Sequence, residues 1–285
     1  MIGPGRAVLP KPGDRYSLGR SGLRVSPICL GITQSPDTVL AAYEAGANFF
    51  FITADLHWPM YEATRQGLRK LLQGNNSRRD ELVVAVVSYL EEPLFQALQF
   101  HEVIDEIPGL ERVDLLLAGA ISNDLSFYSR VQSLTNARLG AHLGAAAIGG
   151  SFHQRSYALL AANTNLLDIM YTRYNALHPG AGRDLFPYLN PQRAVLNYNF
   201  KSTMPKISRE RFTDMGFTGE HWFPEAGDHY RFVLTRPQVD GLLCSPASPE
   251  EFKSLVNSLD KGPLRADEEN YLILLSTLSW PKVFS

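Results

Sequence analysis

Two polar residues with complementary chemistry follow an apolar run in the first quarter of the sequence. Asp55 and His57 come shortly after the run Ala47–Thr53, and Trp58 follows them. A carboxylate next to an imidazole can orient the ring, and an oriented imidazole can give and take protons. If the chain stays extended past Ala54, residues two apart point to the same side. We therefore interpret His57 as a catalytic acid or base and Asp55 as the residue that orients it.

The same two side chains leave other interpretations open. His57 could be an ordinary polar loop residue, and an Asp-x-His pair could supply two metal ligands. The six remaining histidines show no ligand spacing, so no metal site is expected; they are His101, His142, His153, His178, His221 and His229.

Other side chains able to bind a small molecule lie at the ends of later apolar runs. Arg173 could meet a substrate carboxylate with two parallel hydrogen bonds. Tyr198 could equally pack inside the protein. The residues that we assign to substrate binding are Trp58, Tyr89, Tyr171, Arg173, Asn197 and Tyr198.

The apolar runs alternate with helix-like segments. Eight runs are expected to form strands, at Ile28–Leu30, Ala47–Thr53, Leu82–Ser88, Val113–Ala118, Leu143–Gly149, Leu167–Thr172, Ala194–Asn199 and Gly241–Cys244. Unbroken apolarity indicates burial on both faces and hence a parallel sheet. Eight strand–helix units in this length predict an α/β fold, a closed (β/α)₈ TIM barrel whose site lies after the strands. An open doubly wound sheet is the alternative, but the sequence lacks its G-x-G-x-x-G turn.

The segments between the strands are predicted to be helices, with one exception. Helices are expected at Pro36–Ala45, Tyr61–Leu72, Glu92–Ile107, Phe127–Ala137, Tyr157–Ala162, Leu185–Leu189, Pro249–Leu259 and Ala266–Leu278. The segment Thr218–Arg231 departs from a compact helix, so we expect a surface excursion there, with a lid or partner surface as the alternative. Two short strands around Arg20-Ser21-Gly22 predict an N-terminal β-hairpin.

Composition restricts the partners and the compartment. The 285 residues are 45% apolar and carry a net charge of −2, with no basic face for nucleic acid or an anionic membrane. Cys29 and Cys244 lie far apart in apolar runs, which is typical of buried thiols.

No run has the length of a membrane span or the form of a signal peptide, so a cytoplasmic protein is expected. Residues 1–14, with three prolines and three glycines, predict a flexible segment before one barrel domain at 15–285.

The sequence resembles the aldo-keto reductase family in seven segments that occur in family order. They are LGRSGLRVSPICLG, AYEAGANFF, VDLLL, AIGGSF, LLDIMYTRYNALH, DLFPYL and VDGLLCSPASPEEFKSLVNSLDKGPL. The resemblance implies a barrel that reduces carbonyls with NADPH, using an Asp, a Tyr, a Lys and a His at its mouth. Placed on this sequence, those four positions are Ile52, His57, Val87 and Gly119. The resemblance therefore implies a member without the catalytic tetrad.

The positions that hold the cofactor in this family also differ. Ser151 and Phe152 stand where the family has Ser and Asn, and Tyr171 stands where it has Gln. After the last strand the family's glycine becomes Ser245 followed by Pro246, which has no N–H to offer, and the Asn of the next helix becomes Leu255. Only Tyr198 matches the tyrosine that stacks on the nicotinamide, so no cofactor is expected.

Three functions remain open from the sequence. We favour a non-redox acid–base enzyme in a biosynthetic pathway, catalysing a dehydration, isomerisation or cyclisation of a small molecule. A non-catalytic scaffold subunit that binds a pathway protein is the second hypothesis. An atypical NADPH-dependent carbonyl reductase with His57 as the proton donor is the third.

Overall fold

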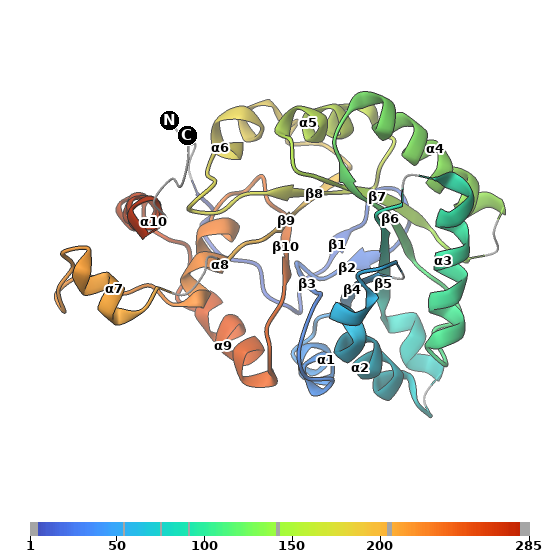
Figure 1. The fold of residues 1–285 in the computed structure, drawn as a ribbon, viewed down its shortest axis with the longest axis horizontal. Helices are drawn as coiled ribbons and strands as arrows, with labels where there is room; N and C mark the ends of the chain where they lie inside the picture. The colour runs from blue at the N-terminus through green and yellow to red at the C-terminus, as the bar shows by residue number, and fades with distance from the viewer. Residues whose placement is uncertain are drawn as a thin grey trace.

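The computed structural model describes residues 5–53, 55–74, 76–90, 92–140, 143–203 and 207–279. Within these residues eight parallel strands form a closed barrel, surrounded by helices in Figure 1. The strands are β3 (Ile28–Leu30), β4 (Phe49–Thr53), β5 (Val83–Ser88), β6 (Leu115–Ile121), β7 (Ala147–Phe152), β8 (Ile169–Arg173), β9 (Leu196–Phe200) and β10 (Gly241–Cys244). The predicted (β/α)₈ barrel is therefore confirmed.

Helices lie between the strands. They are α1 (Asp37–Glu44), α2 (Glu62–Leu72), α3 (Pro93–Glu106), α4 (Asp124–Gly140), α5 (Arg155–Thr164), α6 (Ala181–Asp184), α7 (Arg209–Asp214), α8 (Ala226–Leu234), α9 (Pro249–Leu259) and α10 (Ala266–Ser279). Short 3₁₀ turns add η1 (Trp58–Tyr61), η2 (Asn76–Glu81) and η3 (Phe186–Tyr188). No helix in the described part of the chain is both long and apolar enough to span a membrane.

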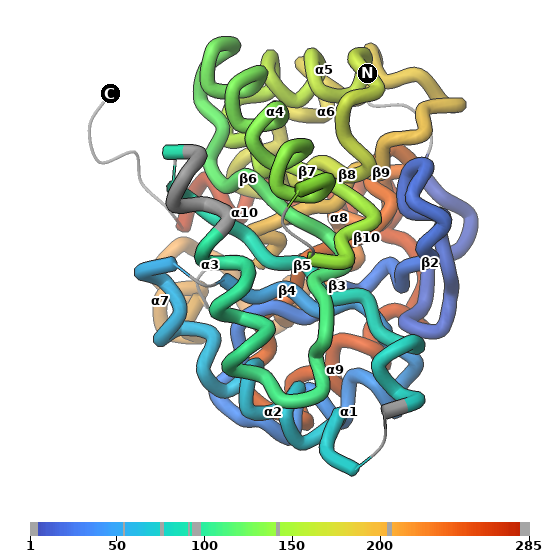
Figure 2. The backbone as a smooth tube through the Cα atoms, turned by 90° about the vertical axis from the view of Figure 1, so that its right-hand side faces the viewer, coloured from blue at the N-terminus to red at the C-terminus, as the bar shows by residue number. Residues whose placement is uncertain are grey.

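The predicted hairpin is also present, as β1 (Tyr16–Ser17) paired antiparallel with β2 (Arg24–Val25). Figure 2 shows it at one end of the barrel and α7 at the other. Residues 1–4 of the segment expected to be flexible lie outside the described residues, and its flexibility stays a prediction. In the remainder Leu9 is buried and the Arg6 amide donates to the Thr235 carbonyl.

Two elements depart from their predictions in bounds or in type. The strand expected from Leu143 begins only at Ala147, because Gly144 has a φ of 71° and turns the chain. The helix expected over Leu185–Leu189 is the 3₁₀ turn η3.

The excursion expected at Thr218–Arg231 is wrong in its second half, which belongs to α8. A capping box begins this helix, since the Glu225 amide donates to Asp228 Oδ2 at 2.9 Å. Asp228 also forms a buried ion pair with Arg231 at 2.8 Å. Glu225, Asp228 and Arg231 form hydrogen bonds and an ion pair with one another at the start of the helix. The polar character of this stretch therefore does not mean that it is a loop.

A repeated hydrogen bond joins the strands where they begin. A polar residue directly before β4, β6, β8 and β10 accepts a backbone amide from the start of the preceding barrel strand or, in the case of Asn48, from Ser26, two residues before β3. The four bonds run from Ser26 N to Asn48, from Val84 N to Asp114, from Ile148 N to Asp168 and from Asn197 N to Asp240, at 2.8, 2.7, 3.0 and 2.7 Å. Buried amides need such partners. These side chains therefore fix the register at the amino ends of the strands.

Aromatic rings fill the barrel above this level. Phe49 lies against Tyr198 and Phe51 against Tyr171, each pair with ring centroids 5.5 Å apart. The Tyr198 hydroxyl donates to the Ser26 carbonyl at 2.7 Å, toward the end of the barrel where the hairpin lies. Packed side chains are what a (β/α)₈ barrel has in place of a pore.

Asp114 offers a stability test with a matched control. Its carboxylate accepts from Arg79 at 2.7 Å and both side chains are buried, whereas Asp80 pairs with Arg112 while 79% exposed. Asp114→Ala leaves the Arg79 charge buried without that partner, so it should lower the free energy of unfolding by about 3–5 kcal/mol. Asp80→Ala should cost about 1 kcal/mol or less. Equilibrium urea unfolding measures both, and equal losses would contradict this account of the barrel.

Candidate active site

A cavity of about 810 Å³ opens at the carboxyl ends of the strands. The loop after β4 supplies His57, Met60 and Tyr61, and Tyr89 follows β5. The other lining residues are Ile32, Phe51, Ser151, His153, Tyr171, Arg173, Asn175, Leu177, His178, Phe200, Lys201, Ser202, Thr203, Tyr230, Leu243 and Ser245. This is the end of the barrel at which enzymes of this architecture place their chemistry.

Asp55 and His57 do form a pair, but by a different geometry from the one expected. The Asp55 Oδ1 atom accepts both the His57 amide at 2.9 Å and the His57 Nδ1–H at 2.8 Å. The chain therefore makes an Asx turn after β4 instead of continuing extended. With Nδ1 donating to the carboxylate, Nε2 is the ring nitrogen that can exchange a proton.

The Asp55 carboxylate is buried and well supplied with donors. Its second oxygen, Oδ2, accepts the Tyr89 amide at 2.9 Å, which ties the loop after β4 to the loop after β5. Burial alone would raise the pKa of Asp55, but the hydrogen bonds from His57 and Tyr89 outweigh it and hold the pKa below 3.8. Asp55 is therefore ionised at neutral pH and can stabilise a positive charge on His57.

Tyr89 and Gly119 complete the surroundings of His57. The Tyr89 ring centroid lies 4.7 Å from that of His57. A Cβ atom on Gly119 would lie 2.4 Å from Tyr89 Cδ1, closer than real contacts allow. Gly119 thus leaves the space that the Tyr89 ring occupies beside His57.

The structure gathers some of the predicted site residues and separates others. His57, Tyr89, Tyr171 and Arg173 line the cavity, with Asp55 directly behind His57. Trp58 is not among the lining residues and stacks under Arg65, whose guanidinium carbon is 5.5 Å from the ring centroid.

The two residues predicted from β9 lie away from the cavity. Asn197 is fully buried, accepts from Thr172 Oγ1 at 2.7 Å and donates to the Gln238 carbonyl. Tyr198 is fully buried below the cavity. The aromatic residue of β9 that lines the cavity is Phe200, the next residue on the same face of the strand.

The site residues predicted from the sequence do not include several polar residues of the cavity. His153 and Lys201 directly follow β7 and β9, and His178 lies in the loop after β8. Their common signal is position, since each follows the carboxyl end of a barrel strand. Ligand spacing between histidines could not reveal them.

The positions assigned to the reductase tetrad are mostly outside the cavity. Ile52, Val87 and Gly119 do not line it, and His57 does. On β4 the residue facing the cavity is Phe51, one position before Ile52. The assignment of these positions depends on the resemblance and stays a prediction.

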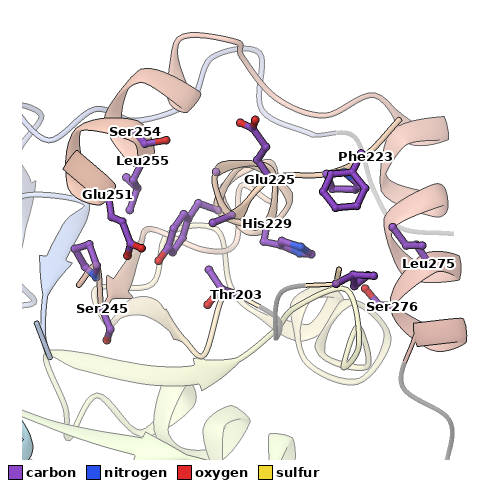
Figure 3. A pocket seen from close by; sticks show the side chains of 16 residues that line it. Thr203, Phe223, Glu225, His229, Ser245, Glu251, Ser254, Leu255, Leu275 and Ser276 are labelled. Carbon is purple, nitrogen blue, oxygen red and sulfur yellow. The ribbon is translucent and has the colours of Figure 1, made fainter. Parts of the chain in front are cut away.

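A second cavity of about 470 Å³ adjoins the first and shares Thr203, Tyr230 and Ser245 with it. In Figure 3, Ser245, Glu251 and Leu255 lie to one side of His229, and Phe223 and Leu275 lie to the other. Glu225 and Glu251 line this cavity and no Lys or Arg does so among the described residues. Burial lowers the pKa of His229 to about 4, so this ring is neutral at physiological pH.

Solved aldo-keto reductases share this fold. AKR11C1 from Bacillus halodurans, in its holo form, is 11% identical and aligns over 95% of this chain and 98% of its own, with a TM-score of 0.71. PA4992 from Pseudomonas aeruginosa, classed provisionally as an aldo-keto reductase, is 18% identical over 90% of this chain and 98% of its own, with a TM-score of 0.65. No protein-family model and no curated protein sequence matches this chain. At these identities the likeness concerns the fold.

Asp55→Asn tests the electrostatics of the pair. The pKa of Asp55 is lowered in the folded protein, so the ionised carboxylate stabilises the fold. This contribution should be complete above pH 3.8 and should disappear as the pH falls further. Asp55→Asn should lower the free energy of unfolding by about 1–3 kcal/mol at pH 7, and the deficit should shrink below about pH 4. Asp37→Asn, an exposed carboxylate on α1, is the control. A deficit that stays constant down to pH 3 would refute the assignment.

Proposed function

We propose that this protein is a non-redox acid–base enzyme that converts a small molecule in a biosynthetic pathway. The observation that carries this proposal is the Asp55–His57 pair at the mouth of the 810 Å³ cavity. A buried carboxylate fixes the tautomer of a half-exposed imidazole, which is how proteins prepare a histidine for proton transfer. The reaction classes that need only this chemistry are dehydration, isomerisation and cyclisation.

The proton balance of such a reaction can be met by His57 alone. Nε2 would take a proton from a substrate carbon or hydroxyl, and Asp55 would offset the charge of the imidazolium that forms. The same proton would then pass to a leaving hydroxyl in a dehydration, or to another atom of the substrate in an isomerisation or cyclisation. The protein returns to its starting state without an oxidant or a reductant.

Neutral tyrosines around the cavity support this chemistry. Burial raises the pKa of the Tyr61, Tyr89 and Tyr171 hydroxyls, so each remains protonated at physiological pH. A protonated hydroxyl can donate a hydrogen bond to a carbonyl oxygen on which negative charge develops. We assign Tyr89, Tyr171 and Arg173 as substrate contacts, and leave out Trp58, Asn197 and Tyr198 because of where they lie.

We further propose that the protein does not use NADP(H). A dinucleotide phosphate needs amide donors or cations. Pro246 has no amide hydrogen, and the Ala247 amide already donates to the Glu251 carboxylate at 2.9 Å. Glu225 and Glu251 line the adjoining cavity and no Lys or Arg does so among the described residues, so the residues present there do not fit the cofactor.

A scaffold role is the second candidate, and exposed apolar side chains favour it. Leu56 is 90% exposed and Met60 is 55% exposed in the loop that carries His57. Exposed apolar side chains near each other can mark a protein interface. A scaffold would keep its function when His57 is replaced, whereas the enzyme would lose it.

His57→Gln tests the proposed enzyme. Incubation with a small-molecule cell extract, followed by mass spectrometry, should reveal a compound that the wild type converts to an isomer or to a product lighter by one water. His57→Gln should slow that conversion by about 100- to 10,000-fold. His101→Gln, an exposed histidine on α3, should leave the rate unchanged. Conversion by His57→Gln at the wild-type rate would exclude the proposed role.

A titration with NADPH tests the cofactor proposal. Neither NADPH fluorescence nor the melting temperature of the protein should change up to about 1 mM cofactor, because a specific site would bind far more tightly than this. Micromolar binding would favour the third hypothesis, an atypical carbonyl reductase with His57 as proton donor.

A further inference from the structure

We propose that the cavity wall formed by the ends of β7, β8 and β9 binds a carboxylate or phosphate group of the small molecule. Arg173 and Lys201 would contact this oxyanion, with His153 and His178 beside them. In the barrel β8 stands opposite β4, so the oxyanion site faces the Asp55–His57 pair across the cavity. That the bound molecule is a substrate rests on the proposed function, whereas binding itself does not.

The charges around the cavity are not balanced by the protein. Arg173 and Lys201 line it, and no Asp or Glu does so among the described residues. Among the described residues, neither Arg173 nor Lys201 forms an ion pair. Three buried or half-buried arginines elsewhere do have one: Arg79 pairs with Asp114, Arg193 with Asp240, and Arg231 with Asp228. Burial lowers the pKa of Arg173, which is the cost of removing an unpaired cation from water. A bound anion would offset that cost.

One amide joins the loops that carry these groups. Asn175 Nδ2 donates to the Lys201 carbonyl at 2.7 Å, and Asn175 Oδ1 accepts the His178 amide at 2.8 Å. Lys201 has a φ of 55°, a left-handed conformation that is uncommon for a residue with a side chain. On the other side of the wall, the His153 ring contacts the Phe200 ring at 5.1 Å. The cationic side chains therefore extend from a connected and positioned backbone.

The two histidines respond to the same positive charge. Burial and then the neighbouring cations lower the pKa of His153 and His178, so both are neutral at pH 7. A bound oxyanion would cancel part of that repulsion and raise the pKa of both. Binding should then take up protons, and affinity should increase as the pH falls. Other titratable groups lining the cavity are His57 and four tyrosines whose pKa burial raises, Tyr61, Tyr89, Tyr171 and Tyr230.

The adjoining 470 Å³ cavity is a poor alternative site for the same group. Its lining carries Glu225 and Glu251 and a neutral His229. Among the described residues this cavity offers an oxyanion no Lys or Arg, whereas Arg173 and Lys201 line the larger cavity.

Calorimetric titration with inorganic phosphate and with succinate, at constant ionic strength, tests the oxyanion site. The wild type should bind at least one probe with a Kd below about 10 mM, and the preferred probe tells phosphate from carboxylate recognition. Arg173→Met should weaken binding at least about tenfold because it removes a charge-assisted bidentate contact. Lys201→Gln, at an exposed position, serves as a second variant if Arg173→Met fails to fold. Arg183→Met removes an exposed guanidinium on α6 and should leave binding unchanged.

The His57→Gln protein separates this proposal from the proposed function. It should bind the probe as the wild type does. Its affinity, corrected for protonation of the probe itself, should rise at least about threefold between pH 7.5 and 5.5, where ordinary histidines titrate. That rise cannot come from His57. Binding that persists in Arg173→Met and Lys201→Gln, or no binding by the wild type, would overturn the oxyanion site. Oxyanion binding by a protein that converts no compound would leave the site standing and refute only the enzyme.

Discussion

Side-chain oxygens at the amino ends of the strands hold the barrel in register. Asn48, Asp114, Asp168 and Asp240 directly precede alternate barrel strands, and each accepts a backbone amide at or just before the start of the neighbouring strand. Each of these oxygens gives a hydrogen-bond partner to a backbone N–H that would otherwise lack one. Because these contacts lie at the end away from the cavity, the residues at the carboxyl ends of the strands can differ widely while the architecture is kept.

Asp55 uses the same interaction at the opposite end for a different purpose. Like Asn48, Asp114, Asp168 and Asp240, it accepts backbone amides, here those of His57 and Tyr89. It also accepts the Nδ1–H of a half-exposed ring, which the four lower residues do not. The electrostatic potential differs between the two sides of the cavity. The ionised Asp55 carboxylate lies behind His57 on one side, and the cations Arg173 and Lys201 line the wall at the ends of β8 and β9 on the other. A molecule with an oxyanion at one end would present its other end to the imidazole.

The sequence predicts the architecture well because its signal is repeated. The unbroken apolar runs locate all eight strands, and the bounds of β3 and β10 agree to the residue. The site is predicted less well because it depends on turns and on which face a residue occupies. The Asp55–His57 pair was anticipated, but through an extended chain instead of an Asx turn. On β9 both Tyr198 and Phe200 face inward, and the sequence does not show that Phe200 is the one at cavity level. His153, His178 and Lys201 converge only because β7, β8 and β9 are neighbours in the barrel.

The central claim, that Asp55 prepares His57 for proton transfer, can be tested without a substrate. Nitrogen-15 NMR of the imidazole at about pH 9, well above the ordinary pKa of histidine, reports which ring nitrogen carries the proton. Free imidazole side chains favour the proton on Nε2. The geometry predicts that His57 carries it on Nδ1, and that Asp55→Ala returns it to Nε2. A wild-type His57 protonated on Nε2 would contradict the account.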